Sequence, residues 1–256
     1  HRDLHSFPTR RSSDLTYNRW NKARKKLGHF FFFERLYSFA QVIVDRVAIF
    51  ACPKNPFRLV YDGLENLDQL ASQGGILLGA HIGNWETGLS FLNHESHIRP
   101  VVAMVRVEGD LLQEFLTQKG GEFITIIPLD VKEHEKNMFL MKTHLEKGEV
   151  VAMHGDRFFG KSRTVQVNFL GRPALFPIGP YLLAATMERS LCFVHVLKVT
   201  HLTYRLVCSK PKKYSWDPRR SREEQIEEWV TEYVRFLEEY IGRYPDQWFN
   251  FYHFWD

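Results

Sequence analysis

The stretch LLGAHIGNWE, residues 77–86, contains an imidazole and a carboxylate that could act together in proton transfer. His81 follows the apolar run GILLGA, and Glu86 comes five residues later. A neutral imidazole can take a proton from an alcohol as that alcohol attacks an activated carbonyl. A carboxylate on the other ring nitrogen fixes the tautomer and stabilises the imidazolium that forms. These residue types predict a general base, His81, oriented by Glu86.

The five-residue spacing leaves a second interpretation open. Neighbours on one face of a helix are three or four residues apart, so the two side chains meet only if His81 lies in a turn before the helix. Gly83 can relax the backbone of such a turn. In the alternative interpretation, His81 caps the end of a strand and Glu86 faces solvent. Spacing alone does not decide between them.

Apolar runs and helical patterns alternate after residue 56, which predicts the elements that position these residues. We expect strands at residues 57–61, 75–80, 100–105, 123–127 and 150–154. Helices are expected at residues 64–73, 85–92, 111–119 and 134–147. This alternation is typical of an α/β domain with a mostly parallel central sheet flanked by helices. Ligands bind such sheets at the carboxyl ends of the strands, where His81 is expected to lie.

The C-terminal part of the chain continues the same domain. A helix is expected at residues 179–188, followed by adjacent strands at residues 191–200 and 203–210. Ser221 and Glu224 have the spacing of a capping box for a final helix. We see no linker or repeat, so residues 16–256 are interpreted as one domain. Residues 1–15 lack apolar periodicity and are interpreted as a non-native segment.

Residues 16–56 are expected to form an N-terminal, membrane-proximal region with an amphipathic helix. The basic cluster RWNKARKK precedes HFFFF, a combination that suits the edge of an anionic membrane. A solvated helix end followed by core aromatics is the alternative. The apolar stretch at residues 38–52 contains Asp45 and Arg46 and is shorter than the roughly 20 residues of a spanning helix.

Composition limits the remaining classes of function. The net charge of +4 is compatible with anionic lipid, phosphate or nucleic acid, and it does not choose among them. The three cysteines, Cys52, Cys192 and Cys208, lack metal-binding spacing and are expected to be reduced core residues of a cytosolic protein. A metal-dependent hydrolase would need at least three convergent ligands. No nucleic-acid recognition motif is present.

The segment HIGNWE resembles the HX4E block of the lysophospholipid acyltransferase superfamily, and its context is most similar to the bacterial lipid A biosynthesis (lauroyl/myristoyl) acyltransferase branch. VVAMVR, HGDRFFG and GRPALFPIGP are similar to the later blocks of that branch, and PDQWFNFYHFWD to its aromatic tail. The similarity extends from about residue 39 to the C-terminus. This branch usually starts with a membrane-anchoring hydrophobic helix, whose absence here favours an N-terminally truncated product.

The resemblance implies transfer of a fatty acyl chain from an acyl carrier protein or coenzyme A thioester to a hydroxyl or amine of a lipid acceptor. It implies no metal or other cofactor, a place in lipid A-type envelope biosynthesis, and peripheral contact with the cytoplasmic face of the bacterial inner membrane. The catalytic roles fall to His81 and Glu86. Substrate contacts are expected at Gly83, Asn84, Arg106, Asp156, Arg157, Phe159 and Pro177.

Several of these roles have structural alternatives. Arg106 suits a phosphate group, but it could instead pair with a nearby surface carboxylate. Asp156 and Arg157 are expected either to support the His81 region or to brace the loop that follows them. For the whole protein, the alternative is a catalytically silent module that binds lipid or acyl carrier protein. Such a module need not keep both His81 and Glu86.

Overall fold

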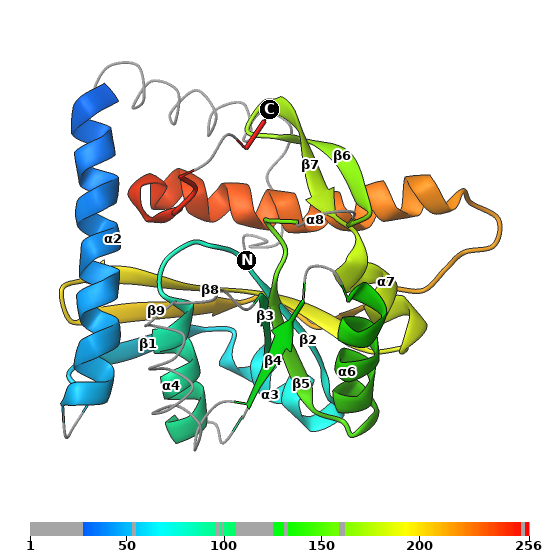
Figure 1. Ribbon diagram of the computed structural model, residues 1–256, viewed down its shortest axis with the longest axis horizontal. Helices are drawn as coiled ribbons and strands as arrows, with labels where there is room; N and C mark the ends of the chain where they lie inside the picture. The colour runs from blue at the N-terminus through cyan, green and yellow to red at the C-terminus, as the bar shows by residue number, and fades with distance from the viewer. Residues whose placement is uncertain are drawn as a thin grey trace, which may run out of the picture.

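An eight-stranded, mostly parallel sheet organises the part of the chain that the structure describes (Figure 1). This computed structural model describes residues 28–52, 55–95, 98, 100–105, 125–130, 133–158, 162–251 and 254–255. The strands are β1 (Arg58–Asp62), β2 (Gly75–Gly79), β3 (Val101–Val105), β4 (Thr125–Leu129), β5 (Val150–His154), β8 (Ser190–Thr200), β9 (Thr203–Cys208) and β10 (Lys212–Lys213). Their order is β1-β9-β8-β2-β5-β3-β4, with β10 beside β8.

The pairing confirms the predicted single α/β domain. Strand β2 is parallel to both of its neighbours, β5 and β8, and β3 is parallel to β4 and β5. The two strands that were expected to be adjacent, β8 and β9, pair antiparallel. The helices are α2 (Gly28–Ala51), α3 (Leu64–Gln73), α4 (Trp85–Glu95), α6 (His134–Glu146), α7 (Gly179–Thr186) and α8 (Arg222–Arg243), with a short 3₁₀ helix η1 (Pro245–Gln247).

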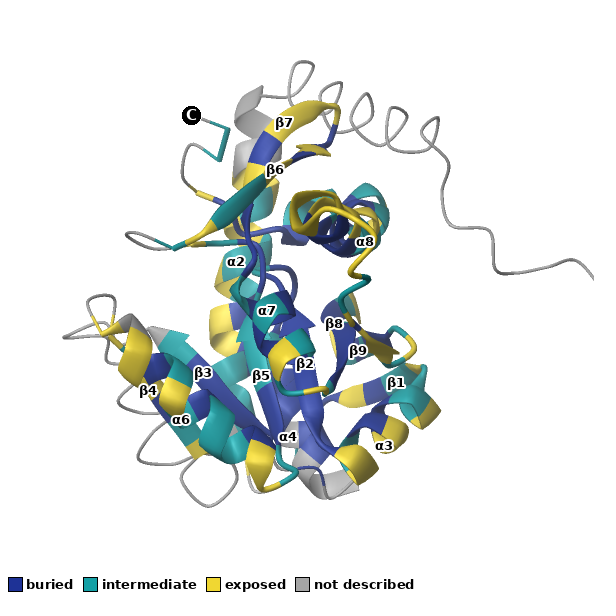
Figure 2. Cartoon of the chain, turned by 90° about the vertical axis from the view of Figure 1, so that its right-hand side faces the viewer, coloured by how far each residue is buried: buried dark blue, intermediate teal, exposed yellow. Residues whose placement is uncertain are grey.

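Strand β2 lies at the centre of the sheet, and every one of its residues is buried (Figure 2). Ile76 and Leu78 pack into a core shared with α6, α7 and α8, while Leu77 packs on the opposite face with α3 and α4. A strand covered on both faces needs an unbroken apolar sequence, and GILLG provides one. The loop after β2, which begins with His81, is therefore held on a rigid support.

Two features differ from the sequence-based expectation. The strand expected at residues 123–127 lies at Thr125–Leu129 and includes Pro128, which is tolerated because β4 is at the edge of the sheet. A hairpin of β6 (Thr164–Phe169) and β7 (Arg172–Pro177) was not expected. Its turn lacks an Asn-Gly signal, and Leu170 adopts a φ of 49° there. Leu170 is buried and donates its N–H to Glu238 of α8 at 2.6 Å, which explains why this conformation is kept.

Other expectations have mixed outcomes. Ser221 does cap α8, since its side chain accepts from the N–H of Glu224 at 3.1 Å. All three cysteines are free thiols, but Cys52 is exposed rather than in the core because it follows the end of α2. The expected helix at residues 111–119 and the interpretation of residues 1–15 lie outside the described residues.

Helix α2 stands at one edge of the molecule and confirms the helix expected in the N-terminal region (Figure 1). Its inner side includes the buried residues Val42 and Asp45. Its outer side exposes apolar residues at helical spacing, namely Phe33, Leu36, Tyr37, Ile43, Val44 and Val47. We call these six residues the α2 outer face. Within the described part of the chain, no helix is long and apolar enough to cross a bilayer.

Candidate active site

The site forms where β2 and β5 end side by side. In the parallel register of these strands, Gly79 lies opposite His154. His81 and Asp156 each come two residues further along their chains, so the register brings these two side chains to the same point on the carboxyl edge of the sheet. The site is therefore where ligands bind in open α/β sheets.

His81 and Asp156 make a two-point contact. The imidazole Nδ1 lies 2.8 Å from Asp156 Oδ1, and the backbone N–H of His81 donates to Asp156 Oδ2 at 3.0 Å. The His81 side chain is 28% exposed and that of Asp156 only 2%. With Nδ1 engaged by the carboxylate, Nε2 is the ring nitrogen left to exchange a proton with a substrate.

The Asp156 carboxyl is held in its ionised form despite its burial. Burial alone would raise its pKa, but the charge of His81 and the hydrogen bonds from His81 outweigh that effect and lower the pKa well below its usual value. An ionised carboxylate can only accept hydrogen bonds, so in the neutral form of the His81 ring the proton is fixed on Nδ1. This leaves a lone pair on Nε2, as a general base requires.

A second histidine packs against the first. The rings of His81 and His154 have centroids 4.3 Å apart, and Trp85 meets His154 edge-on at 5.5 Å. Burial, followed by the charge of His81, lowers the pKa of His154 to about 3. His154 is therefore neutral at physiological pH, and its uncharged ring packs against the ring of His81.

The turn after His81 is shaped by Gly83 and Asn84. Gly83 has a φ of 68°, and a Cβ on it would lie 1.9 Å from the carbonyl oxygen of Val196. Asn84 is fully buried; its N–H donates to that same carbonyl at 2.7 Å, and its Oδ1 accepts from the N–H of Thr87 at 3.2 Å. Asn84 thus occupies the N-cap position of α4, where asparagine is favoured.

A segment near the C-terminus closes one side of the site. The N–H of Phe249 donates to the carbonyl of His81 at 2.8 Å, and Gly83 donates to the carbonyl of Gln247 at 2.9 Å. The indole N–H of Trp248 points at Asp156 Oδ2 from 3.4 Å, and Arg157 donates to the carbonyl of Phe249 at 2.8 Å. Residues 247–249, which we call the C-terminal clamp, therefore hold both the His81 turn and the Asp156 loop.

The predicted contact between His81 and Glu86 is replaced by a different pairing. Among the described residues, the carboxylate that meets His81 is Asp156, while Glu86 pairs with Arg46 of α2 at 2.9 Å. Glu86 is only 4% exposed, so it does not face solvent either. The reason is geometric: the Gly83 turn separates the two residues, and the first turn of α4 directs Glu86 toward α2.

The other predicted site residues are distributed as follows. Arg157, like Asp156, is at the site, but its described hydrogen bond is to the C-terminal clamp. Pro177 ends β7 and pairs with Thr164 in the hairpin. Arg106 and Phe159 lie outside the described residues.

Sequence reasoning missed the contributions of Trp248 and Arg46, and it left His154, which directly precedes Gly155 and Asp156, out of the predicted site residues. His154 ends β5, and Asp156 follows that apolar strand as His81 follows β2, which indicated that both side chains lie at the same edge of the sheet. Pairing Asp156 with His81 still required the register of the two strands. Arg46 interrupts an apolar stretch together with Asp45, which indicates an inward-facing charged group that needs a partner. Trp248 gave no such signal, because its approach to Asp156 depends on the path of the C-terminal clamp.

Together, the fold and the pair define a histidine–carboxylate site at the carboxyl edge of a mostly parallel α/β sheet. The family model described as "Bacterial lipid A biosynthesis acyltransferase" matches residues 33–256. The chain therefore belongs to this family, as the resemblance of its motifs implied. It is also 27% identical, over 139 residues, to phosphatidylinositol mannoside acyltransferase from two strains of Mycobacterium tuberculosis, H37Rv and CDC 1551. The match covers 53% of this chain and 43% of each relative.

Replacing Gly83 tests the shape of the turn against a matched control. Gly83 and Gly148 both have positive φ, 68° and 77°, but a Cβ on Gly148 would meet nothing within 4 Å. Gly148→Ala should cost about 1 kcal/mol of unfolding free energy, because only the left-handed conformation is penalised. Gly83→Ala adds the overlap with Val196 and should cost about 3 kcal/mol or more. Urea denaturation measures both, and equal losses would contradict the described turn.

The buried histidines predict how stability depends on pH. The pKa of His195, lowered by burial to about 3 like that of His154, lies below its unfolded value of 6.5. Between about pH 6.5 and 4, the unfolded chain takes up protons that these two side chains do not bind when folded, so stability falls as pH falls. Each histidine contributes at most about 1.4 kcal/mol per pH unit.

This dependence can be measured by urea denaturation at pH 6.5, 5.5 and 4.5. His195 packs against the rings of Phe236 and Tyr240, so His195→Phe keeps an aromatic side chain and removes one titrating group. In the variant, the part of the change of unfolding free energy with pH that is assigned to the two histidines should fall by up to half. This holds whatever the absolute stability of the variant. An unchanged slope of unfolding free energy against pH would show that His195 takes up protons over the same pH range in the folded protein as in the unfolded chain.

Proposed function

We propose that this protein transfers a fatty acyl chain from a thioester, carried by acyl carrier protein or coenzyme A, to a hydroxyl or amine of a lipid. The observation that carries this proposal is the contact of His81 Nδ1 with the buried, ionised Asp156, in a chain that belongs to an acyltransferase family. Lipid A-type envelope biosynthesis is the setting that the family favours.

In the proposed reaction, Nε2 of His81 takes the proton of the acceptor hydroxyl as the hydroxyl oxygen attacks the thioester carbonyl. A new carbon–oxygen bond forms, the carbon–sulfur bond breaks, and His81 returns the proton to the departing thiolate. Asp156 stays ionised and stabilises the transient imidazolium. No metal or cofactor takes part in these steps.

The proposal changes the role first expected of Glu86. Asp156 is the orienting carboxylate, and Glu86 supports the site through its ion pair with Arg46. Gly83 and Asn84 act by shaping the turn after His81. Arg106 and Phe159 keep their proposed roles as substrate contacts, and Arg106 is proposed to bind a phosphate group.

We also propose that the protein contacts a membrane peripherally, at the cytoplasmic face of the inner membrane. The α2 outer face supports this, because apolar residues at helical spacing are exposed along one side of α2. The phenyl ring of Phe251, which is 47% exposed, lies 5.3 Å from that of Phe39 on α2. A lipid surface against α2 would therefore lie near the C-terminal clamp and the site it closes.

The proposed roles predict a specific ranking of variants. Transfer from radiolabelled lauroyl-acyl carrier protein or lauroyl-CoA to a bacterial lipid extract should fall about 10²–10⁴-fold in kcat for His81→Ala and Asp156→Asn. KM for the donor should stay within about twofold, because neither change removes a group that holds the donor in the ground state. Glu86→Gln should instead lower stability, because it leaves the buried guanidinium of Arg46 without its charged partner.

The ranking separates the alternatives. Full transfer by His81→Ala would remove the general-base role and favour a silent lipid- or carrier-binding module. A loss in Glu86→Gln as large as that in Asp156→Asn, with unchanged stability, would make Glu86 the orienting group. The denaturation midpoint of each variant is the necessary companion measurement.

Binding to lipid vesicles tests the role proposed for the α2 outer face. Val44 is 65% exposed there, and Phe139 on α6 is 68% exposed elsewhere. Val44→Glu should weaken sedimentation with phosphatidylglycerol/phosphatidylcholine vesicles by about tenfold, because a carboxylate replaces an apolar group that enters the interface. Phe139→Glu is the matched control and should bind as the unaltered protein does. Equal losses would mean that net charge, not α2, governs binding.

A further inference from the structure

Helix α2 carries two consecutive charged residues into the protein interior. Asp45 is 7% exposed, and the side chain of Arg46 is 13% exposed. Placing charges in a buried position is unfavourable unless each is paired and hydrogen-bonded. An apolar side chain at either position would pack α2 against the sheet without that penalty, so their partners indicate what the charges do.

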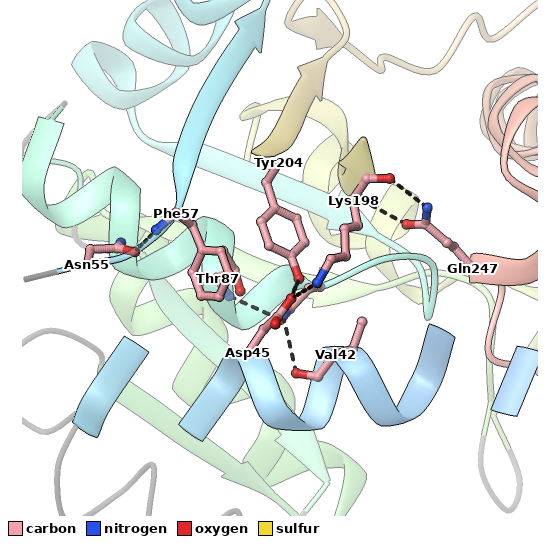
Figure 3. Close-up of polar contacts among 9 residues, drawn as sticks. Val42, Asp45, Asn55, Phe57, Thr87, Lys198, Tyr204 and Gln247 are labelled. Atoms are coloured by element: carbon pink, nitrogen blue, oxygen red, sulfur yellow. Dashed lines mark hydrogen bonds and ion pairs between the residues drawn. The ribbon is translucent and has the colours of Figure 1, made fainter. Parts of the chain in front are cut away.

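Asp45 accepts hydrogen bonds from two residues of neighbouring strands. The ammonium of Lys198 on β8 and the hydroxyl of Tyr204 on β9 both donate to Asp45 Oδ2 (Figure 3). Tyr204 is fully buried; its burial and then its bond to Asp45 raise the pKa of its hydroxyl far above the usual value. The Tyr204 hydroxyl therefore stays protonated and donates a hydrogen bond to Asp45.

The first route from Asp45 leads through Tyr204 to Asn84. Because the Tyr204 hydrogen is used on Asp45, its oxygen is left to accept, and it accepts from Asn84 Nδ2 at 3.3 Å. This fixes which end of the Asn84 amide faces Tyr204, so Oδ1 points to the N–H of Thr87 and caps α4. A carboxylate that only accepts thus sets the direction of the whole chain of bonds.

The second route leads through Lys198 to Gly83. The Lys198 backbone exchanges two hydrogen bonds with the side chain of Gln247, at 2.9 and 2.8 Å (Figure 3). The carbonyl of Gln247 in turn accepts from the N–H of Gly83 at 2.9 Å. The two routes from Asp45 therefore end on Gly83 and Asn84, the second and third residues after His81.

Arg46 adds a third connection to the same place. Its guanidinium pairs with Glu86, which lies in the first turn of α4, directly after the capped turn. The three connections all leave one turn of α2 and all reach residues 83–86. Packing alone would not require this convergence.

We propose that Asp45 and Tyr204 are positioning residues, through which α2 holds the His81 turn in its reactive geometry. The proposal rests on the proposed function, in which His81 is the base. Neither residue touches the reacting atoms; each acts by fixing the direction of the hydrogen bonds that end on Asn84 and Gly83. If the direction of these hydrogen bonds is lost, the turn samples other arrangements. The imidazole of His81 is then correctly oriented toward a substrate for a smaller fraction of the time.

Two nearly isosteric variants test the proposal. Asp45→Asn introduces a donor, so the Tyr204 hydroxyl can reverse and stop accepting from Asn84; Tyr204→Phe removes the hydroxyl. Asp62→Asn is the matched control. It makes the same chemical change in an exposed ion pair that joins β1 to Arg205 at 3.2 Å, on the strand that carries Tyr204.

Amide hydrogen exchange of the full chain measures the turn without any substrate. In Asp45→Asn and Tyr204→Phe, the amides of Gly83 and Asn84 should exchange at least about tenfold faster relative to that of Leu77 in β2. With lauroyl-CoA and the lipid extract, kcat should fall about tenfold and KM should stay within about twofold. Asp62→Asn should match the unaltered protein in both measurements.

The outcomes distinguish this proposal from the proposed function. Unchanged exchange at Gly83 and Asn84, or an equal rise at Leu77, would show that Asp45 and Tyr204 only contribute to global stability and would overturn the positioning role. The same holds if KM rises while kcat is unchanged. Full transfer by His81→Ala would instead overturn the proposed function, and the exchange results would still report on the turn.

Discussion

The site depends on the register between two parallel strands. Because Gly79 lies opposite His154, the first polar side chains beyond β2 and β5 arrive at the same edge, and His81 meets Asp156. A shift of one residue would turn one of these side chains to the other face of the sheet. The register is itself secured by burial: β2 is enclosed by apolar layers on both faces, so any other alignment would expose part of its leucine and isoleucine surface. The relative position of His81 and Asp156 is thus fixed by hydrophobic packing several residues away.

The second constraint is the burial of Asp156. A carboxylate that is 2% exposed stays ionised only if donors surround it, and here they come from distant parts of the chain: the ring and backbone of His81, and the indole of Trp248. The neutral ring of His154 packs beside that of His81 and adds no charge there. Orientation of the His81 ring is therefore a property of the folded domain and not of a short motif.

Much of the fold follows from the sequence, because strands that are buried on both faces have continuous apolar runs and the helices between them have clear periodicity. His81 was identifiable because a histidine directly follows such a run. Its partner was mistaken because the motif offers a nearby acid, Glu86, and proximity in sequence suggested a contact that the Gly83 turn prevents. Choosing Asp156 requires the register of two strands, which a single sequence does not specify. The hairpin at Leu170 was missed for a related reason: its left-handed backbone is held by Glu238 from another helix.

The C-terminal clamp has a consequence for how the protein folds during its synthesis. Strands β2 and β5 are synthesised well before residues 247–249, which bind the carbonyl of His81 and the N–H of Gly83. A polypeptide still emerging from the ribosome therefore lacks these hydrogen bonds to the His81 turn until residue 249 has left the exit tunnel. The His81 turn is therefore expected to reach its final geometry late in folding, only after residues 247–249 have docked against it.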